Sequence, residues 1–215
     1  MMYKILSLAM VLLLGVIITF ACHYIPSYTE DEYNHLKISE TESNKNNIEK
    51  VEIGGALYNV PYPWKGNRIE TPADPGDLVL IPFEFTDSKK IYVTKETRKA
   101  FISMALEAQR EGIYIIVASG YRSYDYQAKV IEQTLTQDAT FYHAVKWTAP
   151  PGYSEHITGE ALDFTPGNRS FKETRVYQWL KTNASRFCFK ESYSRYNKEG
   201  FEWEPWHWKY ELCEL

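Results

Sequence analysis

The sequence predicts a domain of the α+β class, and three observations support this prediction. An uninterrupted run of apolar, mostly β-branched residues, Ile113 to Ala118, is typical of a central strand. A stretch with helical periodicity over Lys95 to Glu111 precedes it. Towards the C-terminus, segments 186–193 and 201–212 resemble strands on either side of a turn at 197–200. Strands that are interleaved with helices and close in an antiparallel hairpin indicate α+β.

Length and charge bound the class of protein. The chain has 215 residues, of which 44% are apolar, and this is enough for about one domain with a genuine core. The net charge of -4 offers no basic patch, so we expect no nucleic-acid partner.

The N-terminus has the pattern of an export signal. Residues 5–21 are uncharged and apolar, and they follow Lys4. A run of 17 residues is also at the lower edge of what spans a bilayer, so an uncleaved anchor is an alternative. Cys22 resembles a bacterial lipoprotein cleavage site, which leaves lipidation open. In each case we expect the domain to be exported and tethered to the outer face of the bacterial cytoplasmic membrane.

These observations predict that the chain is divided into three segments. Segment 1–22 is expected to be a signal or membrane anchor. Segment 23–50 is polar and rich in charge, which is typical of a tether. Residues 51–215 are expected to form the folded domain.

The first half of the domain offers a few clear elements. Residues 51–60 are consistent with a hairpin that turns at Gly54-Gly55. Segment 61–82 is rich in proline and is expected to be mostly irregular. Thr94 is placed to cap the helix that begins at Lys95.

Two more helices are expected after the central strand. One is a long helix over about Tyr124 to Lys146. The other ends near Asn183, and the pair Ser170 and Glu173 forms a capping box that would open it.

Two cysteines remain when Cys22 is set aside. Cys188 and Cys213 each lie in an apolar, strand-like segment. They could pair in an oxidising compartment. We favour the alternative of two buried free thiols, because free cysteine is often buried.

Two motifs near the C-terminal half carry the chemistry. The pattern Ser-x-His-x-x-Gly-x-Ala-x-Asp, residues 154–163, places His156 and Asp163 in a polar turn that ends in a short apolar strand. The second motif is Glu204-Pro-Trp-His207. Two histidines and one aspartate suit zinc, and three protein ligands leave a fourth position open to water. A lone His or Asp is far more often an ordinary surface residue, so the combination is what points to a metal.

Together with the turn Ser119–Ser123, these motifs resemble the VanY-type D-alanyl-D-alanine carboxypeptidases, zinc peptidases of peptidoglycan with a Hedgehog-like fold. The resemblance covers about Val93 to Leu212. It implies a small, mainly antiparallel sheet flanked by helices, with Zn²⁺ in a groove along the sheet. Residues 51–215 would then be a zinc carboxypeptidase domain.

The resemblance also implies roles for single residues. His156, Asp163 and His207 would hold Zn²⁺, which lowers the pKa of water from 15.7 toward about 7. Glu204, left unligated, would be the general base. Arg122 would offer two charge-assisted donors to the oxyanion on the scissile carbonyl.

The implied substrate is a peptide that ends in a D-amino acid, from a peptidoglycan stem peptide or precursor. Ser154 and Gln127 would hydrogen-bond its terminal carboxylate or the adjoining backbone. Ser154 could instead cap the loop before His156.

We expect a D,D-carboxypeptidase that removes the last D-alanine. An L,D-carboxypeptidase, a D-Ala-D-Ala dipeptidase or a wall endopeptidase would use the same site. A non-catalytic, zinc-stabilised binding module is a further alternative, but such a module needs neither Glu204 nor Arg122.

Overall fold

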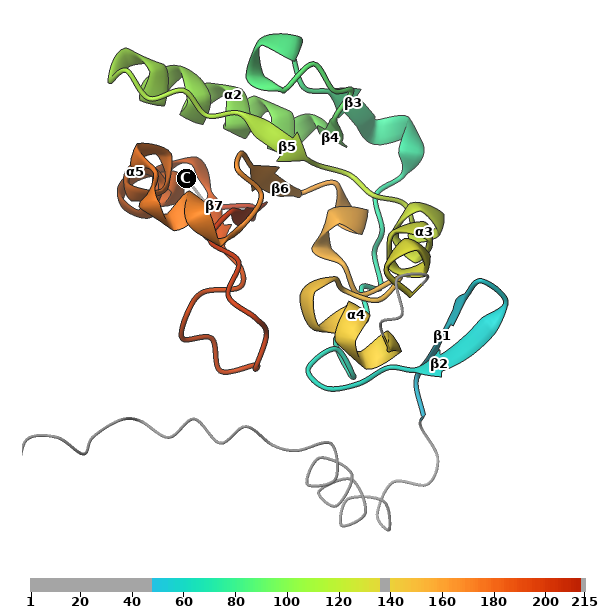
Figure 1. Ribbon diagram of the computed structural model, residues 1–215. Helices are drawn as coiled ribbons and strands as arrows, with labels where there is room; N and C mark the ends of the chain where they lie inside the picture. The colour runs from blue at the N-terminus through green and yellow to red at the C-terminus, as the bar shows by residue number, and fades with distance from the viewer. Residues whose placement is uncertain (1–47, 136–139, 214–215) are drawn as a thin grey trace, which may run out of the picture. The chain divides into compact units, whose positions relative to one another are not determined.

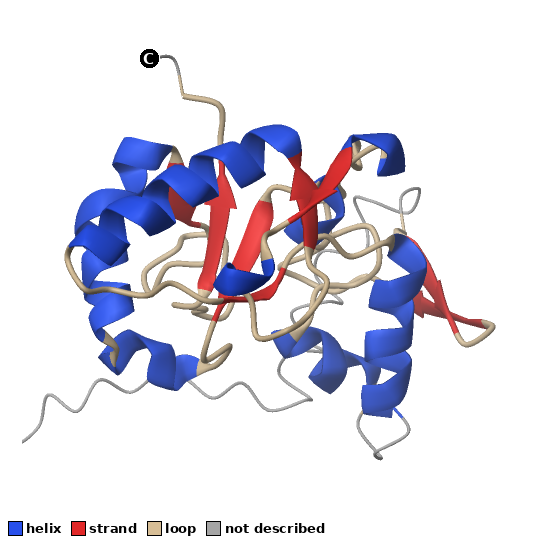
Figure 2. Ribbon diagram, turned by 90° about the horizontal axis from the view of Figure 1, so that it is seen from above, coloured by secondary structure: helices blue, strands red, loops and turns tan. Residues whose placement is uncertain are grey.

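Four short strands form the central sheet in the order β5–β6–β8–β7, and every neighbouring pair is antiparallel. In this computed structural model, which describes residues 48–135 and 140–213, the strands are β5 (Val117–Ser119), β6 (Ala161–Phe164), β8 (His207–Tyr210) and β7 (Phe189–Glu191). Figure 2 shows these strands in the interior with helices around them. The α+β class with a small, mainly antiparallel sheet is confirmed.

A two-stranded ribbon and the longest helix of the described residues cover one side of the sheet. Strands β3 (Leu78–Leu80) and β4 (Tyr92–Thr94) pair with each other, and α2 (Lys95–Arg110) follows at once. Thr94 caps α2 as predicted, because its side chain accepts a hydrogen bond from the backbone N–H of Thr97. Helix α2 lies beside β4 and β5 (Figure 1). Its buried residues are Thr97 and the four apolar residues at helical spacing, Phe101, Met104, Ala105 and Ala108.

Helix α5 (Arg175–Asn183) lies near β7 at the other end of the sheet (Figure 1). Trp179 and Leu180 are buried there, in the same apolar cluster as α2. The predicted capping box of Ser170 and Glu173 is wrong. Both residues lie in the 3-10 turn η4 (Arg169–Glu173), and the helix begins only after Thr174, whose side chain accepts from the backbone N–H of Tyr177. Asn168 caps η4 and Thr174 caps α5, so the sequence pattern alone could not show which of the two residues begins the helix.

The predicted single helix over Tyr124 to Lys146 is also wrong. The structure has α3 (Tyr124–Leu135) and a separate α4 (Phe141–Trp147), whose N-terminus is capped by Thr140. The Thr140 hydroxyl accepts from the backbone N–H of His143 and so favours a new helix start.

The hairpin predicted over 51–60 is confirmed as β1 (Lys50–Ile53) and β2 (Ala56–Asn59). Gly54 and Gly55 have φ of 58° and 79°, which a two-residue turn of this kind requires. The hairpin, α3 and α4 share a second apolar cluster, which includes Val51, Ile131 and Tyr153.

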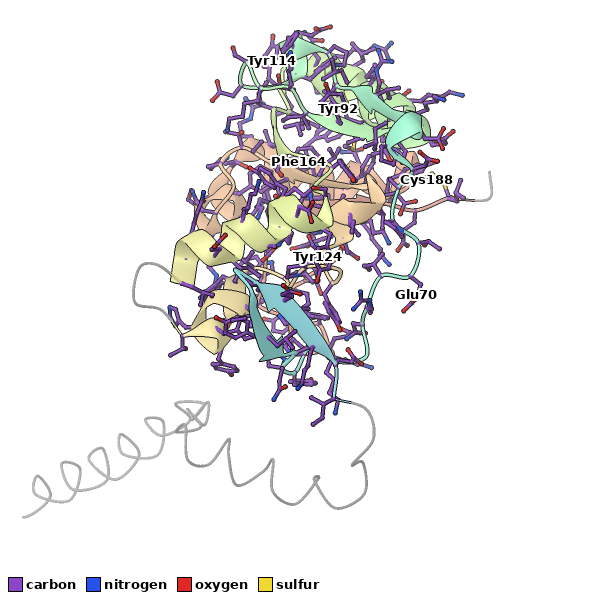
Figure 3. The ribbon with its side chains drawn as sticks, turned by 90° about the vertical axis from the view of Figure 1, so that its right-hand side faces the viewer. Glu70, Tyr92, Tyr114, Tyr124, Phe164 and Cys188 are labelled. Atoms are coloured by element: carbon purple, nitrogen blue, oxygen red, sulfur yellow. A yellow bond between two sulfur atoms is a disulfide. The ribbon has the colours of Figure 1, made fainter. Side chains whose placement is uncertain are left out.

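Strands are shorter than the sequence predicted. Only Val117 and Ala118 of the predicted run 113–118 lie in β5, although Ile113 and Ile115 are buried. The remaining short helical turns are η1 (Pro75–Asp77), η2 (Phe83–Phe85), η3 (Glu155–Thr158) and η5 (Ala184–Phe187). Phe164 of β6 lies inside the molecule, whereas Tyr114 and Glu70 lie on its outside (Figure 3).

Cys188 and Cys213 form a disulfide, so the favoured prediction of two free thiols is wrong. Cys188 immediately precedes β7, and Cys213 follows β8. These two strands pair with each other. The backbone N–H of Glu211 donates to the carbonyl of Cys188 at 2.8 Å, and the two cysteine Cα atoms are 5.6 Å apart. Strand pairing therefore brings the thiols together, which spacing alone could not show.

The described residues, 48–135 and 140–213, form one compact unit. The predicted anchor, 1–22, and residues 23–47 of the predicted tether, 23–50, lie outside the described residues. Lys50, which was expected in the tether, is instead the first residue of β1. Among the residues that are described, no helix is long and apolar enough to cross a membrane.

Candidate metal centre and active site

Strand pairing brings the predicted metal ligands together. Asp163 on β6 stands opposite His207 on β8 in the antiparallel register. His156 reaches the same point from η3, the turn just before β6. One ligand atom from each side chain lies within 4.8 Å of the others, and both imidazoles are buried. These three residues thus have the arrangement that a single metal ion requires.

His156 presents one nitrogen to the centre and fixes the other. Its Nδ1 lies 2.7 Å from the carbonyl of Gly120, an acceptor that requires Nδ1 to carry the proton. Its Nε2 lies 3.1 Å from Asp163 Oδ2 and has no hydrogen-bond partner among the described residues. Burial, with the nearby Arg122 guanidinium, lowers the pKa of His156 to about 4. The buried Nε2 therefore carries an unused lone pair, as a metal ligand should.

His207 lies between two carboxylates. Its Nδ1 is 3.0 Å from Asp163 Oδ1, and its Nε2 is 2.9 Å from Glu155 Oε2. Burial disfavours the charged imidazolium, but the hydrogen bonds to Asp163 and Glu155 outweigh it and raise the pKa of His207 to about 10. A cation is thus favoured between these carboxylates, and a divalent metal ion at Nδ1 would supply that charge instead of a proton.

Glu204 lines the same cavity as these three residues. Its side chain has no hydrogen-bond partner among the described residues. Its backbone is fixed, because its N–H donates to the carbonyl of Tyr193 and its own carbonyl accepts from the N–H of His207, both at 3.0 Å. Burial raises the pKa of Glu204 to about 7, against the opposing charge of His207. A general base works best with a pKa near the working pH.

Arg122 follows the turn that Gly120 makes after β5. Its Nη1 donates to Gln127 Oε1 at 3.1 Å, and its Nη2 donates to Asp163 Oδ2 at 3.4 Å. Gln127 is buried, and its Nε2 donates to the carbonyl of Ala149 at 2.8 Å. Both polar ends of Gln127 are thus engaged, and the side chain holds Arg122 in place.

Ser154 is 4% exposed and lies just before η3. Its side chain makes no capping hydrogen bond to that turn. The alternative of Ser154 as a cap therefore does not hold, and its hydroxyl remains available to the cavity.

All seven predicted site residues line one cavity of about 210 Å³. The rest of its wall is made mainly of aromatic and small residues, namely Trp64, Trp147, Thr148, Ala149, Gly167, Tyr193 and Trp206. Carboxylates, imidazoles and a guanidinium thus converge in a small space with aromatic walls.

Two residues of this site were not predicted. Glu155 lies inside the first motif, next to His156, and could have been found by asking what accepts from the outer nitrogen of a liganding histidine. Tyr193 packs its ring on that of His207, with centroids 4.9 Å apart. Nothing in the sequence separates Tyr193 from the other tyrosines, of which the chain has 17 in all.

A larger hollow of about 600 Å³ lies beside the start of α2 and contains none of the predicted residues. Opposite charges in it face each other, since Lys95 lies 3.5 Å from Asp77 and Lys209 lies 3.7 Å from Glu160. It therefore lacks the convergence of ligands and base that marks the smaller cavity.

Comparison with known proteins gives a consistent result. Residues 90–212 match the VanY family, described as D-alanyl-D-alanine carboxypeptidase. YodJ of Bacillus subtilis (strain 168) is 35% identical over 167 residues, which are 72% of this chain and 59% of YodJ. The chain thus spans 59% to 61% of the length of the first curated relatives that it matches.

Two solved structures extend the comparison. The LdcB LD-carboxypeptidase has a TM-score of 0.59 and 29% identity, and the match covers 76% of this chain and 84% of LdcB. A mutant of the vancomycin resistance D,D-pentapeptidase VanY, solved in complex with Zn(II), has a TM-score of 0.50 and 25% identity over 70% of this chain and 88% of that one. The predicted Hedgehog-like zinc-peptidase fold is confirmed.

Proposed function

The chain belongs to the VanY family of D-alanyl-D-alanine carboxypeptidases, and from this membership we propose that it is a zinc-dependent D,D-carboxypeptidase. It would remove the C-terminal D-alanine from peptidoglycan stem peptides or their precursors. The observation that carries the proposal is the convergence of three ligand atoms within 4.8 Å, next to Glu204, in one cavity.

Zinc suits the donor set better than a hard cation does, because two imidazole nitrogens and one carboxylate are ligands that zinc prefers. His156 Nε2, a carboxylate oxygen of Asp163 and His207 Nδ1 would hold it. When bound, Zn²⁺ supplies an activated water and polarises a carbonyl. The related VanY structure with Zn(II) supports this choice of metal.

Glu204 is the residue that would move protons. It would accept one from the attacking water and return it to the departing amine. Its buried position, which raises its pKa to about 7, supports this role.

Arg122 would bind the oxyanion that forms on the scissile carbonyl. Gln127 and Asp163 hold its two terminal nitrogens, so the guanidinium is oriented before substrate binds. Gln127 therefore acts on the substrate through Arg122.

The small size of the cavity favours removal of a terminal residue. Ligand pockets for larger molecules usually measure about 300–1,000 Å³. A cavity of about 210 Å³ suits the end of a peptide, with the Ser154 hydroxyl available to its carboxylate.

A second candidate function is L,D-carboxypeptidase activity on tetrapeptide stems. The similarity to the LdcB LD-carboxypeptidase favours it. Both activities would use the same metal, base and arginine, so the substrate must decide between them.

The test is to incubate the purified chain, loaded with Zn²⁺, with a pentapeptide stem and with a tetrapeptide stem. We expect D-alanine from the pentapeptide, measured by mass spectrometry, with loss of release in chelator and recovery on adding Zn²⁺. Glu204→Gln should keep bound zinc and lose hydrolysis. Release from the tetrapeptide alone would establish the L,D alternative, and no release from either would refute the proposal.

We also propose that the protein acts outside the cytoplasm, tethered through segment 1–22 as an uncleaved anchor or a lipid-modified chain. The apolar run at 5–21 supports this. Recovery of the protein in the soluble cytosolic fraction would contradict it.

A further inference from the structure

The exposed residues among those that line the catalytic cavity show where the cavity opens to solvent. Most of the lining residues are buried or half-buried, whereas Trp147 and Gly167 are exposed. A sphere of the cavity's volume is about 7 Å across, the extended length of two residues. A longer substrate must therefore emerge past Trp147 and Gly167.

Two cations flank this mouth. Lys146 precedes Trp147, and its Nζ lies 5.5 Å from the centroid of the indole ring. Arg169 follows Gly167 by two positions, and its guanidinium carbon lies 4.7 Å from the centroid of the same ring. The aromatic side chain thus holds both charges at one edge of the opening.

One carboxylate partly neutralises the pair. Glu202 lies 3.3 Å from Lys146 Nζ and 2.8 Å from Arg169 Nη2. Two positive charges against one negative charge leave an excess of one positive charge. Arg169 has five N–H donors, of which the contact with Glu202 uses one. Both cationic side chains are about half exposed, at 48% and 51%, so they can reach a ligand.

We propose that Lys146, Arg169 and Trp147 form a subsite for a free carboxylate of the substrate, upstream of the bond that is cleaved. This inference rests on the proposed function, because it assumes that the C-terminal residues of a peptide fill the cavity. The third residue from the C-terminus then lies at the mouth and the fourth just outside it.

Two carboxylates of a stem peptide could fill such a subsite. One is the free α-carboxylate of a γ-linked D-glutamyl residue, the fourth from the end of a pentapeptide. The other is the side-chain carboxylate of a diaminopimelyl residue, the third from the end. The substrate class is therefore stems that carry a free carboxylate at one of these positions, in preference to stems that are amidated or carry lysine there.

The experiment uses four acetylated pentapeptides ending in D-Ala-D-Ala. They combine D-glutamate or its α-amide at the second residue with diaminopimelate or L-lysine at the third. With the zinc-loaded full-length chain, we expect at least one carboxylate to lower KM about threefold to tenfold relative to the amide-and-lysine peptide, with little change in kcat. The preference should shrink at high salt, because both partners are exposed.

Variants separate the subsite from the catalytic centre. Arg169→Gln should reduce the preference to less than about twofold while leaving kcat for the amide-and-lysine peptide unchanged. Glu202→Gln removes the competing carboxylate and should enlarge the preference. Arg186→Gln is a matched control, since Arg186 is an exposed arginine that lies 4.0 Å from Glu107 and is not part of the cavity wall. Arg186→Gln should keep the wild-type preference.

Equal KM values for all four peptides, or an unchanged preference in Arg169→Gln, would overturn the subsite. If no peptide is hydrolysed, the proposed function fails, and the subsite is then tested by titration calorimetry with the same peptides. Tighter binding of a carboxylate peptide, lost in Arg169→Gln, would support it, and equal binding would overturn it.

Discussion

Each imidazole of the candidate metal centre forms a hydrogen bond through the nitrogen that faces away from Asp163. His156 uses the carbonyl of Gly120, and His207 uses the carboxylate of Glu155. Such contacts fix the ring orientation and leave the other nitrogen to bind metal. Burial raises the pKa of Glu155, but the hydrogen bond from His207 outweighs it and lowers that pKa to about 2. Glu155 is therefore an anion at neutral pH and a permanent acceptor.

Replacing Glu155 with Ala should weaken zinc binding about tenfold to a hundredfold, because His207 loses the partner that orients it. Glu155→Gln keeps an acceptor oxygen and should lose less. The measurement is zinc competition against a chelator of known affinity. Glu160→Ala is the control, since Glu160 lies near Lys209 and not in the metal cluster. An unchanged affinity in Glu155→Ala would show that this contact does not support the metal.

The pKa values of the two imidazoles predict how many protons zinc displaces. Without metal, His207 has a pKa of about 10 and is protonated at pH 7, whereas His156 has a pKa of about 4 and is neutral. The raised pKa of His207 stabilises the metal-free fold fully below about 6.5, and this contribution is lost as the pH rises through about 10. To bind at pH 7, zinc must displace the proton that His207 carries in the metal-free protein. Calorimetry in buffers of different ionisation enthalpy should give about one proton released per ion, and no release would refute the charged state of His207.

At the level of residues, the sequence predicted the side chains that carry chemistry better than those that support them. His156, Asp163, His207 and Glu204 share one cavity, as the two motifs predicted. Gln127 was expected to contact substrate, and it lines the cavity, but its hydrogen bonds to Arg122 and Ala149 were not predicted. Such partners are set by tertiary packing, and no pattern along the chain encodes them.

Among the elements, the turn at Gly120 connects the fold to the metal centre. The next N–H, of Tyr121, donates to the carbonyl of Tyr92 on β4 at 2.7 Å, while the Gly120 carbonyl holds His156. A Cβ at Gly120 would lie 2.6 Å from the Tyr92 carbonyl oxygen and 2.7 Å from Ile91 Cγ2. No side chain fits this space without moving the backbone.

Gly120→Ala should therefore cost about 1–3 kcal/mol of stability, and it should also weaken zinc binding as the carbonyl moves away from His156. Urea unfolding gives the first effect and chelator competition the second. Gly167→Ala is the comparison, because a Cβ there meets nothing within 4 Å. Equal stability of the two variants would contradict the close approach at Gly120.

Helices with one clear capping residue were predicted best. Thr94 stands alone before α2, and the helix begins where expected. The segment over 124–146 carries apolar positions at helical spacing throughout, so periodicity could not reveal the new start after Thr140. Strands were overestimated because a strand ends where its partner ends, and the partner lies elsewhere in the sequence.

On the scale of the whole molecule, the cavity of the candidate site is built from both apolar clusters. Trp64, Ala149 and Tyr193 belong to the cluster of the hairpin, α3 and α4, whereas Trp206 packs against the cluster of the sheet, α2 and α5. The sequence predicted the fold class and the order of most elements. It could not predict that two clusters meet at the metal centre, because that depends on contacts between distant segments.

The disulfide closes a loop of 25 residues that contains β7 and β8, and hence His207. Cys213→Ser should lower the free energy of unfolding by roughly 3 kcal/mol, because the unfolded chain regains the entropy of that loop. Urea unfolding under oxidising conditions measures this. Reductant should lower the stability of the wild type to a similar extent and leave the variant unchanged. An equally stable variant would show that the bond adds nothing to the fold.

The most direct test of the account is a crystal structure of the zinc-loaded protein, with anomalous diffraction at the zinc edge. We predict one anomalous peak, at about 2.0–2.2 Å from His156 Nε2, a carboxylate oxygen of Asp163 and His207 Nδ1, with Glu204 near it but unbound. A peak on His207 Nε2 beside Glu155, or no peak between the two histidines, would contradict the proposed centre and the mechanism that depends on it.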